Sequence, residues 1–344
     1  MDKRVTIYDI AEKLGVSTAT VNRALTGKPR VKEETRALVI KTAEELGFRP
    51  NALARSLARR RMRLAVLGFT GFPEFHLDFL NGARSAGMEL KDYNVDVDYF
   101  SYNDGAVDTP AAERYIEDTL QEICEGGYDG ALVLAHNDPV FSRLREKGVY
   151  VATAVDDLDP AMRSFHICYN GVVAGRIAAE LIYRWMPDRN SPVLIASGWD
   201  GIGIHERTVV GFREQMERTP LRLCGVLYNG DNVRTAYEST LQALDAHPDL
   251  GAIYVNSFNS SGVIRAVQER GLAGKIMLVT SDINDELRAC IRSGVVAASI
   301  FQNQYEQGRR GLHLLYQALA NQVEVAEFNT VDPQIILSSN LGLF

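Results

Sequence analysis

The chain has 344 residues, more than one hydrophobic core usually serves, so we expect two or three domains. Hydrophobic residues make up 46% of the chain and charged residues 24%, which is the composition of an ordinary soluble protein. No apolar run reaches the roughly 18 residues that crossing a bilayer requires. The composition therefore excludes a membrane-spanning protein.

The net charge of -7 is unevenly distributed along the chain. Residues 1–62 contain 14 Lys and Arg against 7 Asp and Glu, a net charge of +7, which leaves -14 for residues 63–344. Only the N-terminal segment is therefore charged to approach a polyanion. A solvated basic tail is the alternative, but this segment also has helical periodicity and turn signals, which a disordered tail does not need.

The basic segment opens with two short helices. Thr6 and Asp9 form a capping pair before apolar residues at helical spacing, and Gly15 ends this first helix. Ser17 then caps a second helix over residues 18–25. A turn this short makes the two helices cross steeply, which is typical of a helix-turn-helix.

A third helix is expected from about residue 32 to residue 46, ending near Gly47. It closes a small core with Val21 and Leu25 of the second helix. The residues expected to face this core from the third helix are Leu38, Ala43 and Leu46.

The first turn of the second helix is expected to enter the major groove of DNA. Arg23 suits bidentate pairing with a guanine edge, whereas Thr18 and Ala19 suit a thymine methyl group or a phosphate. The residues expected to contact DNA from this part of the chain are Thr6, Ser17, Thr18, Ala19, Thr20, Asn22 and Arg23.

Two segments resemble the DNA-binding head of the lac repressor family. Residues 6–25 read Thr-Ile-Tyr-Asp-Ile-Ala-Glu-Lys-Leu-Gly-Val-Ser-Thr-Ala-Thr-Val-Asn-Arg-Ala-Leu, and residues 47–57 read Gly-Phe-Arg-Pro-Asn-Ala-Leu-Ala-Arg-Ser-Leu. The resemblance implies a hinge helix that folds on operator DNA and wedges paired leucines into the minor groove. It assigns the hinge contacts to Asn51, Ala54, Arg55 and Leu57.

The hinge helix has a physical requirement. A helix of about eight residues is too short to be stable alone, so it orders only when DNA and a second copy support it. The alternative for Leu57 is packing on the next domain. The operator sequence stays open, because Thr18 and Ala19 stand where family members often place larger polar residues.

From residue 63 onward, apolar strand patterns alternate with amphipathic helix patterns, which indicates βαβ units and parallel sheets. The strands fall into two sets, so we expect two lobes that bind a ligand outside the carboxyl ends of their strands. The predicted strands are 64–69, 95–100, 130–134 and 149–155, then 192–196, 222–227, 252–255 and 275–279, with a last one at 333–338.

This order is similar to the periplasmic sugar-binding-protein fold that the lac repressor family uses as its regulatory core. The expected fold class is a small all-α helix-turn-helix domain followed by an α/β two-lobed periplasmic-binding-protein-like (type I) domain with parallel sheets. The expected domains are a head at 1–49, a hinge helix and linker at 50–62, and a ligand-binding core at 63–344, with the N-lobe at about 63–160 and 294–322 and the C-lobe at about 161–293 and 323–344.

The resemblance also implies the ligand contacts. Sugars present hydroxyl groups that suit carboxylates, amides and guanidinium groups, and apolar faces that suit aromatic rings such as that of Phe258. A role in the hydrophobic core is the alternative for each aromatic residue. Helix capping is the alternative for the carboxylates of Asp156 and Asp282. Arg207 lies one residue off the usual spacing to Gly211. The implied contacts are Phe72, Phe75, His76, Asp156, Trp199, His205, Arg207, Asn256, Asp282 and Gln302.

Enzymatic signatures are weak in this sequence. The glycines at 198, 201 and 203 match neither a dinucleotide fingerprint nor a P-loop, and no Gly-x-Ser-x-Gly elbow occurs. The four cysteines lie far apart and are expected to be buried reduced thiols. We therefore expect no catalysis, cofactor or metal; a sugar-processing enzyme fused to a DNA-binding head is the alternative.

These patterns predict a cytoplasmic homodimer that represses transcription. It binds double-stranded operator DNA and responds to a small effector, which is a sugar, a polyol or a sugar acid. Only six residues follow the last predicted strand, so no tetramerisation helix is expected. Activation, a corepressor in place of an inducer, and a constitutive DNA binder with a vestigial cleft all stay open.

Overall fold

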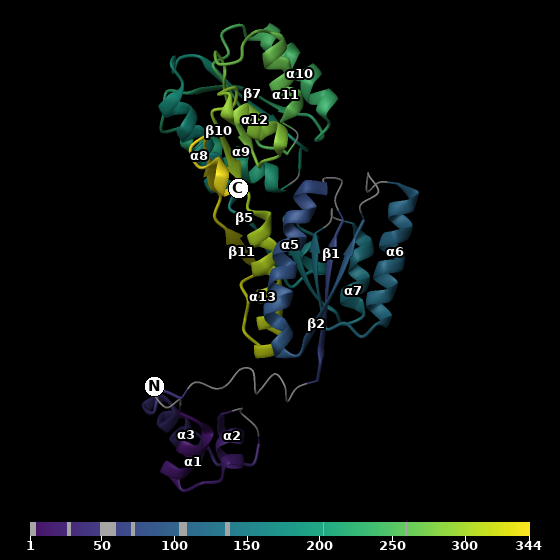
Figure 1. Ribbon diagram of the computed structural model, residues 1–344, viewed down its shortest axis with the longest axis vertical. Helices are drawn as coiled ribbons and strands as arrows, with labels where there is room; N and C mark the ends of the chain where they lie inside the picture. Colours follow the sequence, from purple (N-terminus) through teal and green to yellow (C-terminus); the bar gives the residue numbers. More distant parts are fainter. Residues whose placement is uncertain are drawn as a thin grey trace. The chain divides into compact units, whose positions relative to one another are not determined.

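The computed structural model (Figure 1) divides into two units, one of residues 1–60 with 92–94 and the other of residues 61–91 with 95–344. We call the helices before residue 49 the head and the part after residue 60 the core. The predicted hinge contacts Asn51, Ala54, Arg55 and Leu57 lie outside the described residues. The structure describes residues 5–25, 29–48, 60–69, 73–102, 109–134, 138–201, 203–258 and 260–344.

The head contains the three predicted helices: α1 (Ile7–Leu14), α2 (Thr18–Leu25) and α3 (Glu33–Glu45). Asp9 accepts hydrogen bonds from the backbone and hydroxyl of Thr6, at 2.7 and 2.6 Å. Gly15 ends α1 with a φ of 65°, which glycine adopts without steric cost. The Ser17 hydroxyl caps α2 by accepting from the Thr20 amide at 3.1 Å. The local signals of the helix-turn-helix are thus confirmed.

One core residue of the head was predicted wrongly. Leu38 is 52% exposed, whereas its neighbour Val39 is fully buried against Val21. The inner face of α3 runs through Val39 and Ala43, a spacing of four residues, whereas Leu38 lies about 100° further round the helix. Leu25 and Leu46 pack against this core as predicted.

The first lobe of the core is built on a six-stranded parallel sheet in the order β11-β5-β4-β3-β1-β2. Figure 1 shows α6 and α7 on one side of this sheet and α5 and α13 on the other. The strands are β1 (Met62–Gly68), β2 (Val95–Ser101), β3 (Gly130–Leu134), β4 (Tyr150–Ala154), β5 (Phe165–Tyr169) and β11 (Phe328–Val331), and the helices are α5 (Pro73–Leu90), α6 (Pro110–Glu125), α7 (Ser142–Glu146) and α13 (Gln304–Asn321), with short 3-10 turns at Lys91–Tyr93, Pro139–Phe141 and Pro160–Met162.

The second lobe repeats this winding in the order β12-β10-β9-β8-β6-β7, with only β12 antiparallel to its neighbour β10. Its core lies where α10, α11 and α12 pack on the sheet. The strands are β6 (Pro192–Ser197), β7 (Arg222–Tyr228), β8 (Ala252–Val255), β9 (Met277–Ser281), β10 (Ala298–Phe301) and β12 (Gln334–Ile336), and the helices are α8 (Gly171–Trp185), α9 (Gly203–Met216), α10 (Val233–Ala246), α11 (Ser261–Glu269) and α12 (Asp285–Arg292), with a last 3-10 turn at Leu341–Leu343.

The chain passes between the lobes three times, and at each passage the lobe boundary differs from the predicted one. β5 and β11 belong to the first sheet, although both were assigned to the C-lobe, and β10 belongs to the second sheet, although it was assigned to the N-lobe. The physical reason is strand pairing: β5 pairs with β4 and β10 pairs with β9 before the chain leaves either sheet. The passages are therefore β5 to α8, β10 to α13, and β11 to β12.

Each lobe holds a pair of helices whose backbones touch at glycines. A side chain at Gly82 of α5 would meet the Tyr305 carbonyl near the start of α13, and one at Gly308 would meet the Phe79 carbonyl. In the second lobe, Gly175 of α8 faces the Thr208 carbonyl of α9 in the same way. These close approaches join α5 to α13 and α8 to α9.

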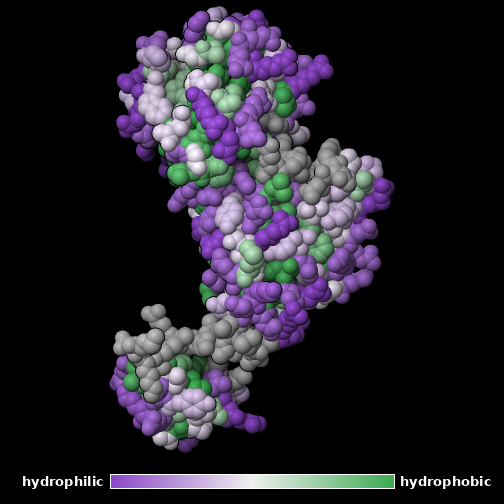
Figure 2. Space-filling view, in the orientation of Figure 1, coloured by the Kyte–Doolittle hydropathy of each residue, from purple (hydrophilic) through white to green (hydrophobic). Residues whose placement is uncertain are grey.

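Hydrophobic side chains reach the surface mainly in separate small patches on the face that Figure 2 shows. Within the described ranges, no helix has both the length and the apolar character to cross a membrane.

Candidate functional site

The outer face of α2 carries the residues predicted to read DNA. Ala19, Asn22 and Arg23 are exposed, while Val21 and Ala24 on the opposite face are buried in the head. Thr18 and Thr20 are half-buried, and the Thr20 hydroxyl lies 2.9 Å from that of Ser17. Ser17 and Thr20 therefore stabilise the start of the helix, which leaves Ala19, Asn22 and Arg23 as its outward-facing side chains.

The start of α5 brings two predicted ligand residues to the carboxyl end of β1. Phe75 is buried and packs edge-on against Phe258 of the second lobe, with ring centroids 6.1 Å apart. His76 is only 1% exposed and lies under Gly68, and neither of its ring nitrogens has a hydrogen-bond partner in the described part of the chain. Burial lowers the pKa of His76, and Arg84 lowers it further. Phe72 lies outside the described residues.

The loop after β4 carries Asp156 and Asp157. Val155 begins this loop with a φ of 68°, a strained conformation for a β-branched residue. Asp157 receives two hydrogen bonds from Arg163, at 2.7 and 2.8 Å, and a third from Thr153 at 2.8 Å. Burial alone would raise the pKa of Asp157, but these hydrogen bonds and the nearby charges outweigh it, so the pKa lies below its usual range.

His166 of β5 lies beside this ion pair. Its Nδ1 is 2.9 Å from the Thr153 hydroxyl and 3.4 Å from Asp157. The pKa of His166 is lowered to about 4, mainly by burial and also by the charges of Arg207 and Arg163, against the opposing charge of Asp157. His166 is therefore neutral near pH 7, and the charges of Asp157 and Arg163 balance each other.

Three predicted ligand residues of the second lobe form one hydrogen-bonded group. The Trp199 amide donates to Nδ1 of His205 at 3.1 Å, and the Asn256 side chain donates to the His205 carbonyl at 3.3 Å and to the Thr208 hydroxyl at 2.6 Å. Trp199 is 53% exposed, and its ring lies over Gly230. The loop after β6 is thus tied to β8 by side chains that the sequence had suggested.

Arg207 of α9 lies against the start of α8. The position of a side chain at Gly171 would be 3.1 Å from its Cβ atom. Its charge also lowers the pKa of Cys168 and Tyr169 at the end of β5, although burial raises both pKa values overall. The Nε atom of Arg207 is buried without a partner among the described residues, so this guanidinium retains a donor for a bound group.

Asp282 follows β9 with a φ of 63° and is 1% exposed. Its carboxylate accepts from the backbone of Gln302 at 3.2 Å and from the side-chain amides of Gln302 and Gln304, both at 2.7 Å. Burial raises the pKa of Asp282 to about 7, and the three hydrogen bonds only partly oppose this rise. Asp282 and Gln302, both predicted as ligand contacts, therefore bind each other, and both carboxylate oxygens of Asp282 already have protein partners.

Several buried polar atoms at the ends of the second-lobe strands and at the start of α13, which follows β10, have no partner among the described residues. They lie at the carboxyl ends of β6, β8 and β9 or just after β10, where open α/β sheets bind ligands. Buried polar groups are usually hydrogen-bonded, so such a concentration indicates bound water or ligand. The atoms are Ser197 Oγ, Asn256 Oδ1, Ser257 Oγ, Thr280 Oγ1, Gln302 Oε1 and Gln304 Oε1.

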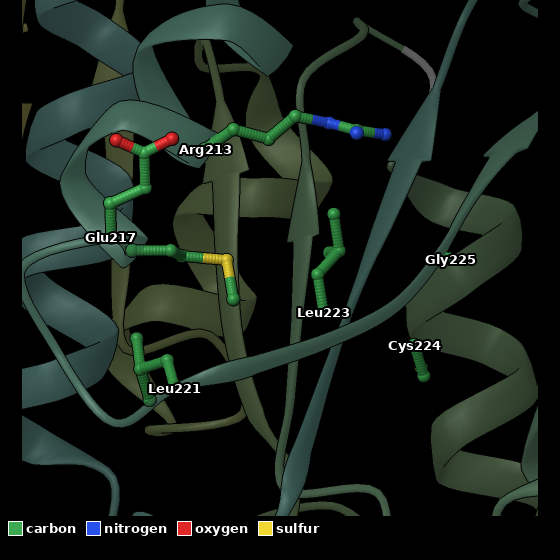
Figure 3. Close-up of a pocket in the computed structure, with 7 residues that line it drawn as sticks. Arg213, Glu217, Leu221, Leu223, Cys224 and Gly225 are labelled. Carbon is green, nitrogen blue, oxygen red and sulfur yellow. The ribbon is translucent and has the colours of Figure 1, made fainter.

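Two hollows lie near these elements without containing the predicted ligand residues. One of about 1150 Å³ lies between the lobes and is lined by neighbours of the predicted contacts, including Asp78, Ile283 and Asn303. The other, about 590 Å³, lies on the second lobe at the amino-terminal end of β7, away from the carboxyl ends of the strands, with Arg213 and Glu217 at its edge (Figure 3).

The described residues contain no group of three or more His, Cys, Asp or Glu side chains that could hold a metal ion. All four cysteines are free, but only Cys168 and Cys290 are buried, whereas Cys124 and Cys224 are half-buried. The prediction of four buried thiols is thus wrong for Cys124 and Cys224, because Cys124 lies at the end of a surface helix and Cys224 lies on an edge strand.

Sequence reasoning missed three residues that organise the site: Arg163, Thr208 and Gln304. Arg163 lies between a turn and a short strand, where an arginine normally indicates a solvated loop. Thr208 lies one residue after Arg207 and looks like an ordinary helix residue. Gln304 had a usable signal, since it follows Gln302 by two residues at a passage between lobes.

Comparisons with known proteins fit this architecture. Residues 66–322 match the periplasmic binding protein domain, and residues 6–51 match the bacterial regulatory proteins of the lacI family. The chain is 25% identical over 342 residues to catabolite control protein A of Staphylococcus xylosus, covering 96% of this chain and 97% of that protein. It is 26% identical over 291 residues to the probable HTH-type transcriptional repressor ExuR of Bacillus subtilis, covering 78% of each.

Among solved structures, the core has the fold of a periplasmic ribose ABC transporter protein from Conexibacter woesei. The TM-score is 0.71 at 22% identity, and the match covers 83% of this chain and 95% of that chain. The helix-turn-helix head and the two-lobed core are therefore both accounted for, and the chain belongs to the lacI family of bacterial regulatory proteins, with a periplasmic binding protein domain as its core.

Proposed function

We propose that this protein is a sequence-specific DNA-binding transcription repressor whose affinity for its operator is controlled by a small sugar-like effector in the cleft between its lobes. The working form is a homodimer whose two heads read half-sites about one helical turn, or roughly 34 Å, apart. It is a regulator and not an enzyme, and its relatives named above carry the names of regulators.

The head supports the DNA-binding part of the proposal. Helix α2 turns Val21 and Ala24 into the core and leaves Ala19, Asn22 and Arg23 outside. An exposed arginine beside an exposed asparagine suits the hydrogen-bonding edges of guanine and adenine in the major groove.

The core supports the effector part. The observation that carries it is a set of buried polar atoms near the carboxyl ends of the second-lobe strands, and the Nε of Arg207, for which the described residues offer no partner. The rings of Phe75 and Phe258, which pack edge-on, add an apolar surface. Hydroxyl-rich ligands with apolar faces satisfy both kinds of group. An acidic sugar would in addition pair with Arg207.

Operator binding is tested by selecting a site from random duplexes with the full chain and measuring affinity at fixed salt. The Arg23→Ala variant should bind that site roughly ten to a hundred times more weakly, the loss typical of one bidentate base contact. Arg184→Ala, an exposed arginine paired with Glu180 in the core, is the control and should leave affinity unchanged. Equal binding by Arg23→Ala and the parent would contradict the assigned reading face.

Effector control is tested by thermal shift with D-glucose, D-galactose, D-ribose, D-allose, L-arabinose and D-glucuronate. A sugar that raises the melting temperature should also change operator affinity, and operator should change the affinity for that sugar by the same factor. A binding sugar that leaves operator affinity unchanged at saturation overturns the control mechanism. A protein that binds operator but none of these sugars favours the constitutive alternative.

A further inference from the structure

Arg163 is a buried cation that joins parts of the chain far apart in sequence. Its side chain is 1% exposed and sits between the 3-10 turn Pro160–Met162 and β5. It donates two hydrogen bonds to the Asp157 carboxylate and a third, at 3.2 Å, to the Glu327 carboxylate. Its guanidinium carbon also lies 4.8 Å from the ring centre of Phe328. A cation this deeply buried is retained only with such partners.

One end of this contact holds the cleft loop. Asp157 follows directly on Asp156, a predicted ligand residue, and the loop starts at the strained Val155. Strained backbone persists only where its surroundings fix it, and here the paired hydrogen bonds to Asp157 do so. Arg145 of α7 fixes the backbone of Arg163 by donating to its carbonyl at 2.6 Å.

The other end holds the strand that leads into the second lobe. Glu327 immediately precedes β11, and its carbonyl accepts from the His166 amide at 2.8 Å. Asn329 of β11 also donates to the His166 carbonyl at 3.3 Å. From β11 the chain passes to β12. Arg163 and Glu327 therefore join the starts of β5 and β11, the two parallel strands of the first sheet from which the chain continues into the second lobe.

We propose that Arg163 is a positioning residue for the effector site: by holding Asp157 and Glu327 together, it couples the loop that carries Asp156 to the start of β11, the strand from which the chain continues into the second lobe. The inference rests on the proposed function for its ligand, but the coupling itself is a property of this chain's own contacts. A bound group that moves the Asp156 loop would then displace β11, and a change at β11 would reach the loop.

The coupling is tested without any ligand by hydrogen–deuterium exchange on the full chain. Glu327→Gln should speed exchange in the loop 155–162 by roughly tenfold, because lost coupling of this kind is typically worth a factor of this order. This effect is expected although Glu327 lies 164 positions from Arg163 in the sequence. Glu117→Gln is the matched control, since it removes the exposed partner of Arg143 in the same lobe.

Asp157→Asn tests the coupling in the opposite direction, from the cleft loop to β11. This variant should speed exchange in residues 323–331, and its effect should be non-additive with Glu327→Gln, because the two carboxylates share Arg163. The coupling is overturned if the exchange rates of residues 155–162 and of residues 323–331 equal those of the parent in both variants. Additive effects of the two substitutions also overturn it, since independent sites add.

The positioning role is tested with whichever sugar of the panel above raises the melting temperature of the parent. Arg163→Lys keeps the charge but loses the paired hydrogen bonds, so it should weaken the affinity for that sugar by roughly tenfold and leave operator affinity without sugar unchanged. Unchanged sugar affinity in both Arg163→Lys and Glu327→Gln overturns the positioning role. If no sugar affects the parent, the proposed effector class fails, while the exchange measurements still decide the coupling.

Discussion

Strands β4 and β9 occupy the same place in the two lobes and differ mainly in what surrounds their ends. Each has five residues, of which the last four are buried, with threonine in the fourth position. Each is followed by a residue of left-handed conformation, Val155 at 68° and Asp282 at 63°. The Thr153 hydroxyl contacts Asp157 and His166, whereas the Thr280 hydroxyl has no partner in the described chain.

The charges follow the same division. At the end of β4, a carboxylate is matched by a buried guanidinium, and the neighbouring histidine stays neutral. At the end of β9, a buried carboxylate accepts hydrogen bonds from amide groups, and its pKa is raised to about 7. The carboxylate at the end of β4 is therefore paired with a cation of its own lobe, whereas the end of β9 keeps the Thr280 hydroxyl, which has no partner in the described chain, for a bound molecule.

The largest expected effect comes from removing the cation that pairs with Asp157 at the end of β4. Arg163→Met leaves Asp157 without its cation, and removing one partner of a buried pair should lower the free energy of unfolding by about 3 kcal/mol. Urea denaturation followed by circular dichroism measures the loss. Arg184→Met, whose side chain is 65% exposed, is the control and should unfold at the urea concentration of the parent. Equal stability of the two variants would show that the Arg163 pair is not a stabilising contact.

The next effect is a pH dependence of opposite sign in the two lobes. Asp282 has a folded pKa of about 7, above its ordinary 3.8, so its contribution to stability is present below about pH 4 and is lost as pH rises to about 7. His166 has a folded pKa of about 4, below its ordinary 6.5, so its contribution is present above about pH 6.5 and is lost as pH falls to about 4.

Single substitutions should separate these two trends. Relative to the parent, Asp282→Asn should gain stability as pH rises from about 4 to 6.5, and His166→Gln should lose stability over the same range. Each change should be at most about 1.4 kcal/mol per pH unit. Urea midpoints at intervals across this range give the slopes. Parallel slopes in the two variants would contradict the opposed assignments.

A third effect concerns a buried amide of the second lobe. Asn256→Ala removes the donor to the Thr208 hydroxyl and to the His205 carbonyl. The His205 carbonyl still accepts from the Thr208 hydroxyl at 2.6 Å, so the substitution should cost about 1 to 2 kcal/mol, mainly through the acceptor of Thr208. The same denaturation assay measures it. Ser257→Ala is a useful comparison, because the Ser257 hydroxyl is buried without a partner in the described residues. A loss as large in Ser257→Ala would argue against the hydrogen bonds of Asn256 as the cause.

The smallest effect is the most direct test of the comparison. Thr153→Val removes a hydroxyl with two partners and should cost about 1 to 2 kcal/mol, whereas Thr280→Val removes one with none and should change stability by less than about 0.5 kcal/mol. The two substitutions are identical in chemistry and lie at matching positions. Equal losses would mean that Thr280 has a partner such as ordered water, and the two strand ends would then be alike.

The sequence was sufficient for the elements with strong local signals. Capping residues and a left-handed glycine defined α1 and α2 of the head, because those contacts lie within a few residues of one another. The alternation of strand and helix likewise predicted two parallel sheets. β5 was missed as a strand because His166 interrupts its apolar pattern, and the residue is accommodated only by contacts with Thr153 and Asp157 on other segments.

Several residues that were predicted as ligand contacts lie together in the structure. Asp282 accepts from Gln302, and Trp199 and Asn256 both donate to His205. Their role as ligand contacts stays a prediction. These residues follow strands, so the topology alone brings them to one edge of a sheet. Arg163 was not foreseen, since its burial depends on Glu327, 164 positions away, and no local pattern reports such a contact.

The glycine contacts between α5 and α13, and between α8 and α9, limit how this protein can deform. Where two backbones touch at Gly82 and Gly308, or at Gly175 and Gly211, a side chain at any of these positions would push the two helices apart. We therefore expect the two helices of each pair to shift together, as one unit, in any rearrangement of the core.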